Sequence, residues 1–175
     1  MKKDNWILKV LLFTFFITII VSGISNYISN HTNIIVLVII TIIITLIGIL
    51  FDMIGTSVLT AKEANFHSMA SYKVKGSKKG IKLIKNKSNI ANFCNDVVGD
   101  ICGIISGSMG AMIAIYTSNK LKLDVTISGI IIASLLSTIT IGGKALGKKY
   151  AINKSDKIIL LIGNILTKLS FKKEK

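Results

Sequence analysis

The most strongly apolar run, Ile34 to Phe51, is the feature that most restricts what this chain can fold into. Its eighteen residues are mostly Ile, Val and Leu, with two threonines and no charge. Isoleucine and valine also favour strands, but a bilayer requires such a run to be helical, because each backbone polar group must be satisfied within the segment. The apolar pattern continues, so we expect one helix to about Ala61. Its cytosolic half would carry Asp52, Thr56 and Ser57.

Three further apolar runs bring the expected number of spans to about four. Trp6 to Ile24 is longer than the apolar region of a usual signal peptide, which favours a retained first span over a cleaved signal. The polar stretch from Ser25 to Asn33 is expected to form a turn. A third span runs from about Phe93 to Tyr116, and a fourth covers Ile127 to Ile141. The predicted fold class is therefore an all-α integral membrane protein, with lysine-rich cytosolic juxtamembrane helices.

The distribution of charge predicts the topology. All 22 basic residues are lysine, against 8 acidic residues, for a net charge of +14. The N-terminus, residues 62–91 and residues 144–175 hold three, eight and nine lysines, whereas the two opposite turns hold none and two. Positive charge stays on the cytosolic side of a membrane. We therefore expect a multi-pass protein of the cell membrane with both termini in the cytosol.

The lysine-rich segments indicate a partner class. Without arginine the chain lacks the side chain that reads nucleic acids through bidentate contacts, so nucleic acid is not an expected partner. Ser77 is expected to cap an amphipathic helix from Lys78 to Lys85, and Ser155 or Asp156 to cap another that ends at Phe171 and lies along the membrane. Lysines beside apolar spans favour anionic lipid headgroups.

The third span carries two carboxylates, Asp96 and Asp100, spaced to share one face of an α-helix. A charge at membrane depth is costly and indicates a functional site. The alternative is that both aspartates lie in the wet interface and merely end the span. Gly99, Gly103 and Gly107 recur at every fourth residue, a spacing that lets helices approach closely. This glycine seam predicts association, and we expect a homodimer.

Three segments resemble a known family: GTSVLTAKEANFHSMA, KGSKKGIKLIKN and TIGGKALGKKYA. From about Ile42 to Ala151 the chain is similar to the transmembrane domain of the CNNM/CorC (CorB-like) magnesium and cobalt transport family. That resemblance implies three spans with basic juxtamembrane helices. It divides the chain into an extra span and turn at 1–33, the family-like transmembrane domain at 34–151, and a cytosolic amphipathic helix and tail at 152–175.

The chain departs from the family at acidic positions, since Thr56 stands where the family has Glu, and Thr140 and Gly143 stand where it has Glu and Pro. Carboxylates elsewhere could replace them, because magnesium takes about six oxygens from carboxylates, hydroxyls, carbonyls and water. The expected metal ligands share hard oxygen donors and lie on three spans: Asp52, Thr56, Ser57, Asp96, Asp100 and Thr140. Magnesium is expected as a bound or transported ion, with no other cofactor.

Two hypotheses follow. The first is a protein related to divalent-cation transport, for magnesium or cobalt, that lacks a regulatory soluble domain. The alternative is a non-transporting membrane scaffold or regulatory module that binds a protein partner or anionic lipid. An enzyme is not expected, because the sequence shows no nucleophile–base arrangement, no cluster of metal-binding histidines and no glycine-rich loop after a strand.

Overall fold

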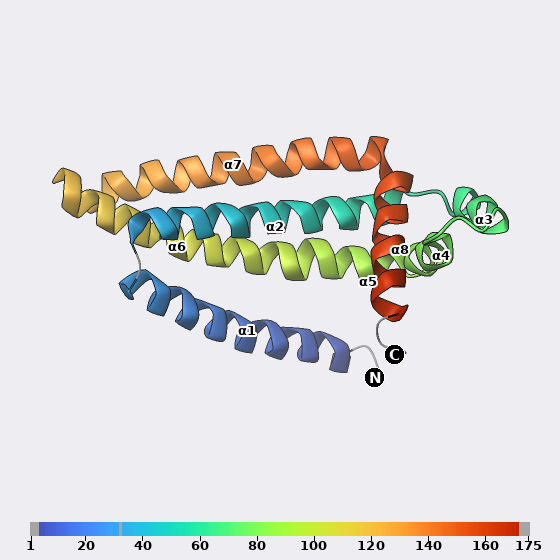
Figure 1. Cartoon of the computed structure of the whole chain (residues 1–175). Coiled ribbons are helices and arrows are strands. Elements are labelled where there is room, and N and C mark those ends of the chain that lie inside the picture. Colours follow the sequence, from blue (N-terminus) through green and yellow to red (C-terminus); the bar gives the residue numbers. More distant parts are fainter. Residues whose placement is uncertain (1–3, 32, 172–175) are drawn as a thin grey trace. The chain divides into compact units, whose positions relative to one another are not determined.

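The computed structural model describes residues 4–31 and 33–171, and every regular element in this part of the chain is helical. The all-α prediction is confirmed. The helices, shown in Figure 1, are α1 (Asp4–His31), α2 (Ile34–Thr60), α3 (Glu63–Ser71), α4 (Ser77–Lys85), α5 (Lys87–Asn92), the π-helical η1 (Phe93–Val98), α6 (Gly99–Leu121), α7 (Val125–Asn153) and α8 (Ser155–Phe171).

The contacts divide the chain into two compact units. Unit 1 comprises Met1–Gly48 and Gly99–Gly143, and unit 2 comprises Ile49–Val98 and Lys144–Lys175. The division passes through α2 and α7, so each of these helices contributes to both units. Each unit therefore combines two separate stretches of the chain. The domains expected from sequence are continuous stretches with boundaries after residues 33 and 151, and they stay a prediction.

Three helical runs in the described residues are long and apolar enough to cross a membrane: α2, the continuous run Lys87–Leu121 and α7. This finding is compatible with a multi-pass membrane protein. The remaining expected span, Trp6 to Ile24, falls in α1, whose apolar stretch in the described residues, Leu11–Ile24, is shorter than the other three. The four-span arrangement therefore stays a prediction.

Two helices continue past the ends expected for them. The polar stretch expected to form a turn from Ser25 continues α1 as far as His31, and α7 extends beyond Ile141, the expected end of the fourth span, without a break at Gly142 and Gly143. A glycine in a helix interior costs only about 1 kcal/mol relative to alanine. A break in a helix that lies in an apolar phase would leave backbone N–H and C=O groups without hydrogen-bond partners, and each such group costs several kcal/mol. Continuation of the helix is therefore the less costly arrangement.

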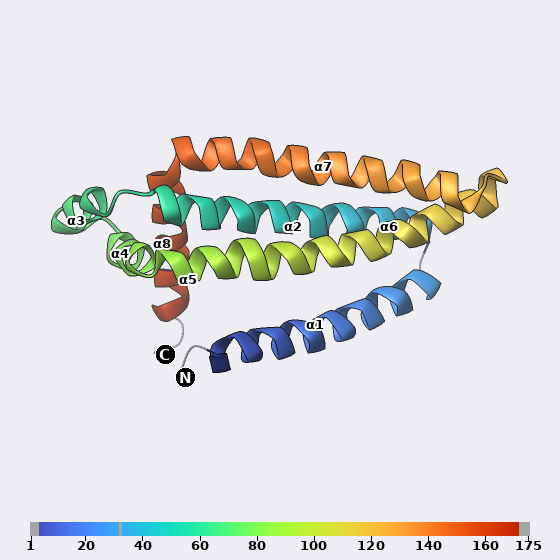
Figure 2. The same cartoon turned by 180° about the vertical axis from the view of Figure 1, so that it is seen from behind.

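The core of unit 1 forms where the first part of α2 meets α6, which run side by side in Figures 1 and 2. Its buried residues are Leu37, Ile105, Met109 and Ile113. The glycines at which helices of unit 1 approach each other closely are not Gly103 and Gly107 of the expected seam. A Cβ on Gly48 would lie 2.9 Å from the Cβ of Cys102, whereas a Cβ on Gly103 or Gly107 would meet nothing within 4 Å. Gly99 of the expected seam is buried, whereas Gly103 and Gly107 remain open, so the homodimer stays a prediction.

The core of unit 2 joins the end of α2 to α3, α4 and α8 through Val58, Ala61, Phe66, Ile84 and Ile159. Phe66 and Ile159 are fully buried. The remaining residues of α4 and α8 pack around this cluster or face outward.

Besides the buried Ile159, two further contacts attach α8 to the rest of unit 2. Near its start, Asp156 accepts hydrogen bonds from the Asn65 side-chain amide (2.6 Å) and from the backbone N–H of Lys62 (3.3 Å). Farther along, Gly163 lies against the backbone of Gly76, which has φ of +83° and caps α4. Asp156 therefore binds α3 rather than capping its own helix.

The start of α4 also differs from expectation. Ser77 is the first residue of α4 rather than its cap, and its hydroxyl donates to the carbonyl oxygen of Val74 (2.6 Å). Gly76 takes the capping position because the left-handed conformation there favours glycine.

The turn between α6 and α7 is closed by polar contacts. Lys122 has φ of +52°, and the Ser118 hydroxyl donates to the carbonyl oxygen of Leu123 (2.7 Å). Asp124 precedes α7 and accepts a hydrogen bond from the backbone N–H of Thr126 (2.7 Å). Hydrogen bonds hold the pKa of Asp124 below its ordinary value. The Thr126 hydroxyl has the largest effect, followed by the backbone N–H groups of Thr126 and Ile127. Asp124 is thus the N-cap of α7.

Replacing Asp124 with alanine should lower the thermal midpoint by a few degrees, because the first turn of α7 loses its cap. The lowered pKa means that the ionised carboxylate stabilises the folded state above the unfolded pKa, and that this contribution disappears as pH falls through the folded pKa. The wild-type and Asp124→Ala midpoints should therefore differ at pH 7, begin to approach each other below about pH 4, and coincide only below the folded pKa of Asp124. A difference that persists unchanged in acid would contradict capping by the carboxylate.

Candidate cation site

The carboxylate of Asp52 is the most deeply buried charge among the described residues. It projects from α2 with only 5% of its side chain exposed. The ammonium of Lys148, on α7, lies 3.7 Å from its Oδ2 atom, which has no hydrogen-bond partner. Gly147 makes this approach possible, because α7 packs there against Met53 and Ile49 of α2. The pair is a charge contact at the outer limit of an ion pair rather than a hydrogen bond.

A second buried oxygen lies on the same side of α2. The Oδ1 atom of Asn95, in η1, is buried and has no hydrogen-bond partner. The Asn95 side chain lies directly against Gly55, where a Cβ atom would overlap it. Gly55 follows Asp52 by three residues, so the two share one helix face. The π-helical turn that carries Asn95 is a rare conformation that is frequent at functional sites.

The two unpartnered oxygens define what this region can do chemically. A carboxylate and an amide carbonyl are hard donors of the kind that Mg²⁺ and Ca²⁺ prefer. A buried polar atom without a partner costs about 1–3 kcal/mol, more when it is charged. A bound cation would remove that cost. The Lys148 side chain is 50% exposed, so its ammonium can turn into water with little desolvation change.

The other residues of unit 2 expected to bind metal are less well placed. Ser57 is fully buried, but its hydroxyl donates to the carbonyl oxygen of Met53 (2.8 Å). Thr56 is half-buried, and Asp96 is exposed. Asp96 lies within η1, where the number of residues per turn differs from that of the α-helix on which its expected face was based.

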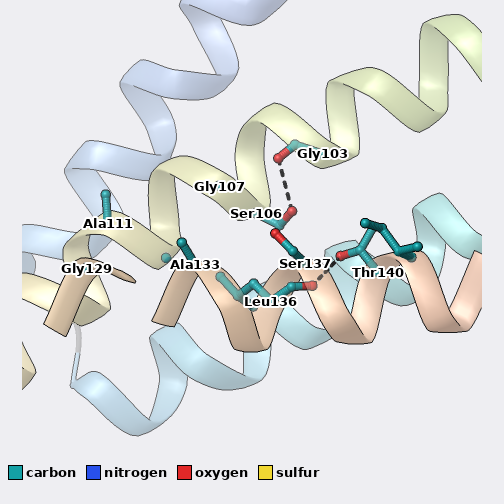
Figure 3. A pocket seen from close by; sticks show the side chains of 11 residues that line it. Gly103, Ser106, Gly107, Ala111, Gly129, Ala133, Leu136, Ser137 and Thr140 are labelled. Atoms are coloured by element: carbon teal, nitrogen blue, oxygen red, sulfur yellow. Dashed lines mark hydrogen bonds between the residues drawn. The ribbon is translucent and has the colours of Figure 1, made fainter. Parts of the chain in front are cut away.

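The remaining two expected ligands belong to unit 1. Asp100, in the first turn of α6, is exposed. Thr140, on α7, is half-buried and its hydroxyl donates to the carbonyl oxygen of Leu136 (2.8 Å). Thr140 lines a half-open groove of about 350 Å³ between α6 and α7, with Gly103, Ser106 and other small residues, as Figure 3 shows.

Two residues of the site were missed by sequence reasoning. Asn95 lies beside Asp96 in the segment NDVVGD, where the two carboxylates are the more conspicuous candidate ligands. Lys148 is one of many lysines after the fourth span, and nothing in its spacing distinguishes it. In the described part of the chain, no three His, Cys, Asp or Glu side chains gather to hold a metal. The six-residue ligand set therefore stays a prediction.

Over residues 4–31 and 33–171 the regular elements are all helical and three helices are long and apolar enough to cross a membrane, which is compatible with a multi-pass membrane protein. No protein-family model, curated protein or solved structure matches the chain. The resemblance to the CNNM/CorC family thus rests on its sequence segments alone.

Proposed function

We propose that this chain is a membrane protein related to divalent-cation transport, with magnesium or cobalt as its ion. The observation that supports the proposal is the pair of buried, unpartnered oxygens, Oδ2 of Asp52 and Oδ1 of Asn95. Both lie on helical runs long and apolar enough to cross a membrane. A buried carboxylate in such a helix is costly, and ion pathways are among the functions that such residues serve.

Lys148 has a specific role in this proposal. In the ion-free protein its ammonium neutralises Asp52 across 3.7 Å. An arriving divalent cation takes the position facing the carboxylate, and the lysine side chain moves into water. Departure of the ion returns the lysine to Asp52. The carboxylate therefore always has a counter-charge, which avoids the several kcal/mol of an unpaired buried ion.

The test measures thermal unfolding of the purified protein in magnesium, cobalt, calcium or manganese. An ion at 100 times its dissociation constant should stabilise the wild type by about 2.7 kcal/mol. Asp52→Asn keeps the shape of the side chain and should abolish this response. Lys148→Met removes the competing ammonium, so it should be less stable without ions and respond at lower ion concentration. Asp100→Asn and Asp96→Asn test the wider ligand set. If both aspartates bind the ion, each substitution should weaken the ion-dependent stabilisation.

Transport itself is measured with the protein in vesicles that contain a magnesium-sensitive dye. Wild type should admit magnesium faster than protein-free vesicles, and Asp52→Asn should not. A wild type without ion-dependent stabilisation and without flux would overturn the proposal.

That negative result would favour the second candidate function, a non-transporting membrane scaffold. The observation in its favour is the Asp52–Lys148 contact itself, because an ion pair between two helices also serves a purely structural role. In a scaffold, Lys148→Met would lower stability equally with and without divalent ions.

A further inference from the structure

Helix α8 has an exposed side that the rest of the described chain does not cover. Leu161, Ile165 and Leu169 are 59%, 48% and 60% exposed. They follow one another at four-residue intervals and so form one stripe along the helix. The opposite side is buried through Ile159 and Gly163. Core packing therefore accounts for one side of α8 and leaves the apolar stripe unexplained.

The position of α8 in the chain places this stripe near a membrane. A single residue, Lys154, separates α8 from α7, a helix long and apolar enough to cross a bilayer. Within unit 2, α8 starts at the end of α7 and turns away crosswise to it in both views (Figures 1 and 2). A helix that turns sideways directly after a span lies at the level of the headgroups.

The charges beside the stripe fit an anionic surface. Lys157 and Lys168 are exposed, and their spacing places them along one edge of the stripe. The one carboxylate within α8, Asp156, is engaged with α3. A second copy of this face would bring lysine against lysine, which disfavours self-association there. Lysine stems can cover apolar surface while their ammonium groups reach phosphate.

We propose that the exposed side of α8 docks on an anionic phospholipid surface, with Leu161, Ile165 and Leu169 among the upper acyl chains and Lys157 and Lys168 on the lipid phosphates. The proposal is independent of cation transport, since it involves none of the residues around Asp52. Each lysine near an anionic surface contributes about a factor of 5 to docking, so the pair contributes roughly 25-fold.

The experiment places a tryptophan in the stripe and measures its contact with lipid. In a Trp6→Phe background, full-length Ile165→Trp is reconstituted into vesicles whose lipids carry bromine on the upper acyl chain, a quencher that acts at short range. The matched control is Tyr72→Trp, at the end of α3, where the side chain is 82% exposed. The Ile165→Trp variant should show blue-shifted emission and strong quenching, and the Tyr72→Trp variant should show neither.

The role of charge is tested by comparing neutral phosphatidylcholine vesicles with vesicles that contain phosphatidylglycerol. Quenching of the Ile165→Trp variant should rise with phosphatidylglycerol, and Lys157→Gln with Lys168→Gln should remove that rise. Three results would overturn the proposal: water-like, unquenched emission from the stripe tryptophan; blue-shifted but unquenched emission, which would mean that protein covers the stripe; or equal quenching of the stripe variant and the Tyr72→Trp control. Unchanged thermal midpoints of the variants verify that the fold is retained.

Discussion

Replacing Phe66 with alanine should lower the free energy of unfolding by about 3–5 kcal/mol, the largest effect expected of any single side chain in unit 2. The Phe66 ring is fully buried where α3, α4 and α8 meet, and it lies directly against Gly80. Gly80 has no side chain that could move into the space, so the cavity would stay open. Thermal or denaturant unfolding in detergent measures the loss.

Tyr72→Ala is the matched control, because it removes an aromatic side chain at the end of the same helix that is 82% exposed. Its effect should stay within about 0.5 kcal/mol. Similar losses for the two variants would show that the core of unit 2 does not depend on Phe66.

Replacing Gly163 with alanine should destabilise the protein by about 3 kcal/mol, at the upper end of the range for overpacking. The added Cβ would overlap the Gly76 backbone, where no side chain can rotate away. Gly76 itself cannot shift freely, since its φ of +83° already depends on glycine. Helix α8 must therefore move off α4 or the two backbones must bend.

Gly142→Ala provides the control for this substitution. Gly142 also lies inside a helix, but a Cβ there would meet nothing within 4 Å. Alanine should stabilise the helix by up to about 1 kcal/mol through its higher helix propensity. The two variants should thus shift the unfolding midpoint in opposite directions. A loss at both positions would mean that helix geometry, rather than the contact with Gly76, is responsible.

The fold was predictable where hydrophobicity alone determines it. Helix α2 was expected to start at Ile34 and end near Ala61, and it ends at Thr60. In contrast, α3 was expected only from the family resemblance, because its own sequence, EANFHSMAS, has no apolar periodicity. Phe66 is buried against α4 and α8, and Asn65 binds Asp156 of α8. Long-range contacts of this kind leave no local pattern in the sequence.

The candidate site was predictable only in part, for a similar reason. Asp52 was expected because a carboxylate inside an apolar helix is conspicuous, and its burial accords with a special role. Asn95 became a candidate only through its contact with Gly55, which joins positions 40 residues apart in the chain. The exposure of Asp96 and Asp100 likewise depends on how the helices pack. Residue type identifies possible ligands, but three-dimensional packing decides which of them are enclosed.

The two attachments of α8 determine more than its stability. Asp156 holds one point of the helix to α3, and Gly163 holds another to α4. Seven residues separate them, which corresponds to about 10 Å along the helix axis. A rod fixed at one point can swing in any direction, whereas a rod fixed at two points can only rock about the line that joins them, and the burial of Ile159 on the same side opposes that rocking. The direction in which Leu161 and Ile165 face is therefore set by the contacts of α8 within unit 2.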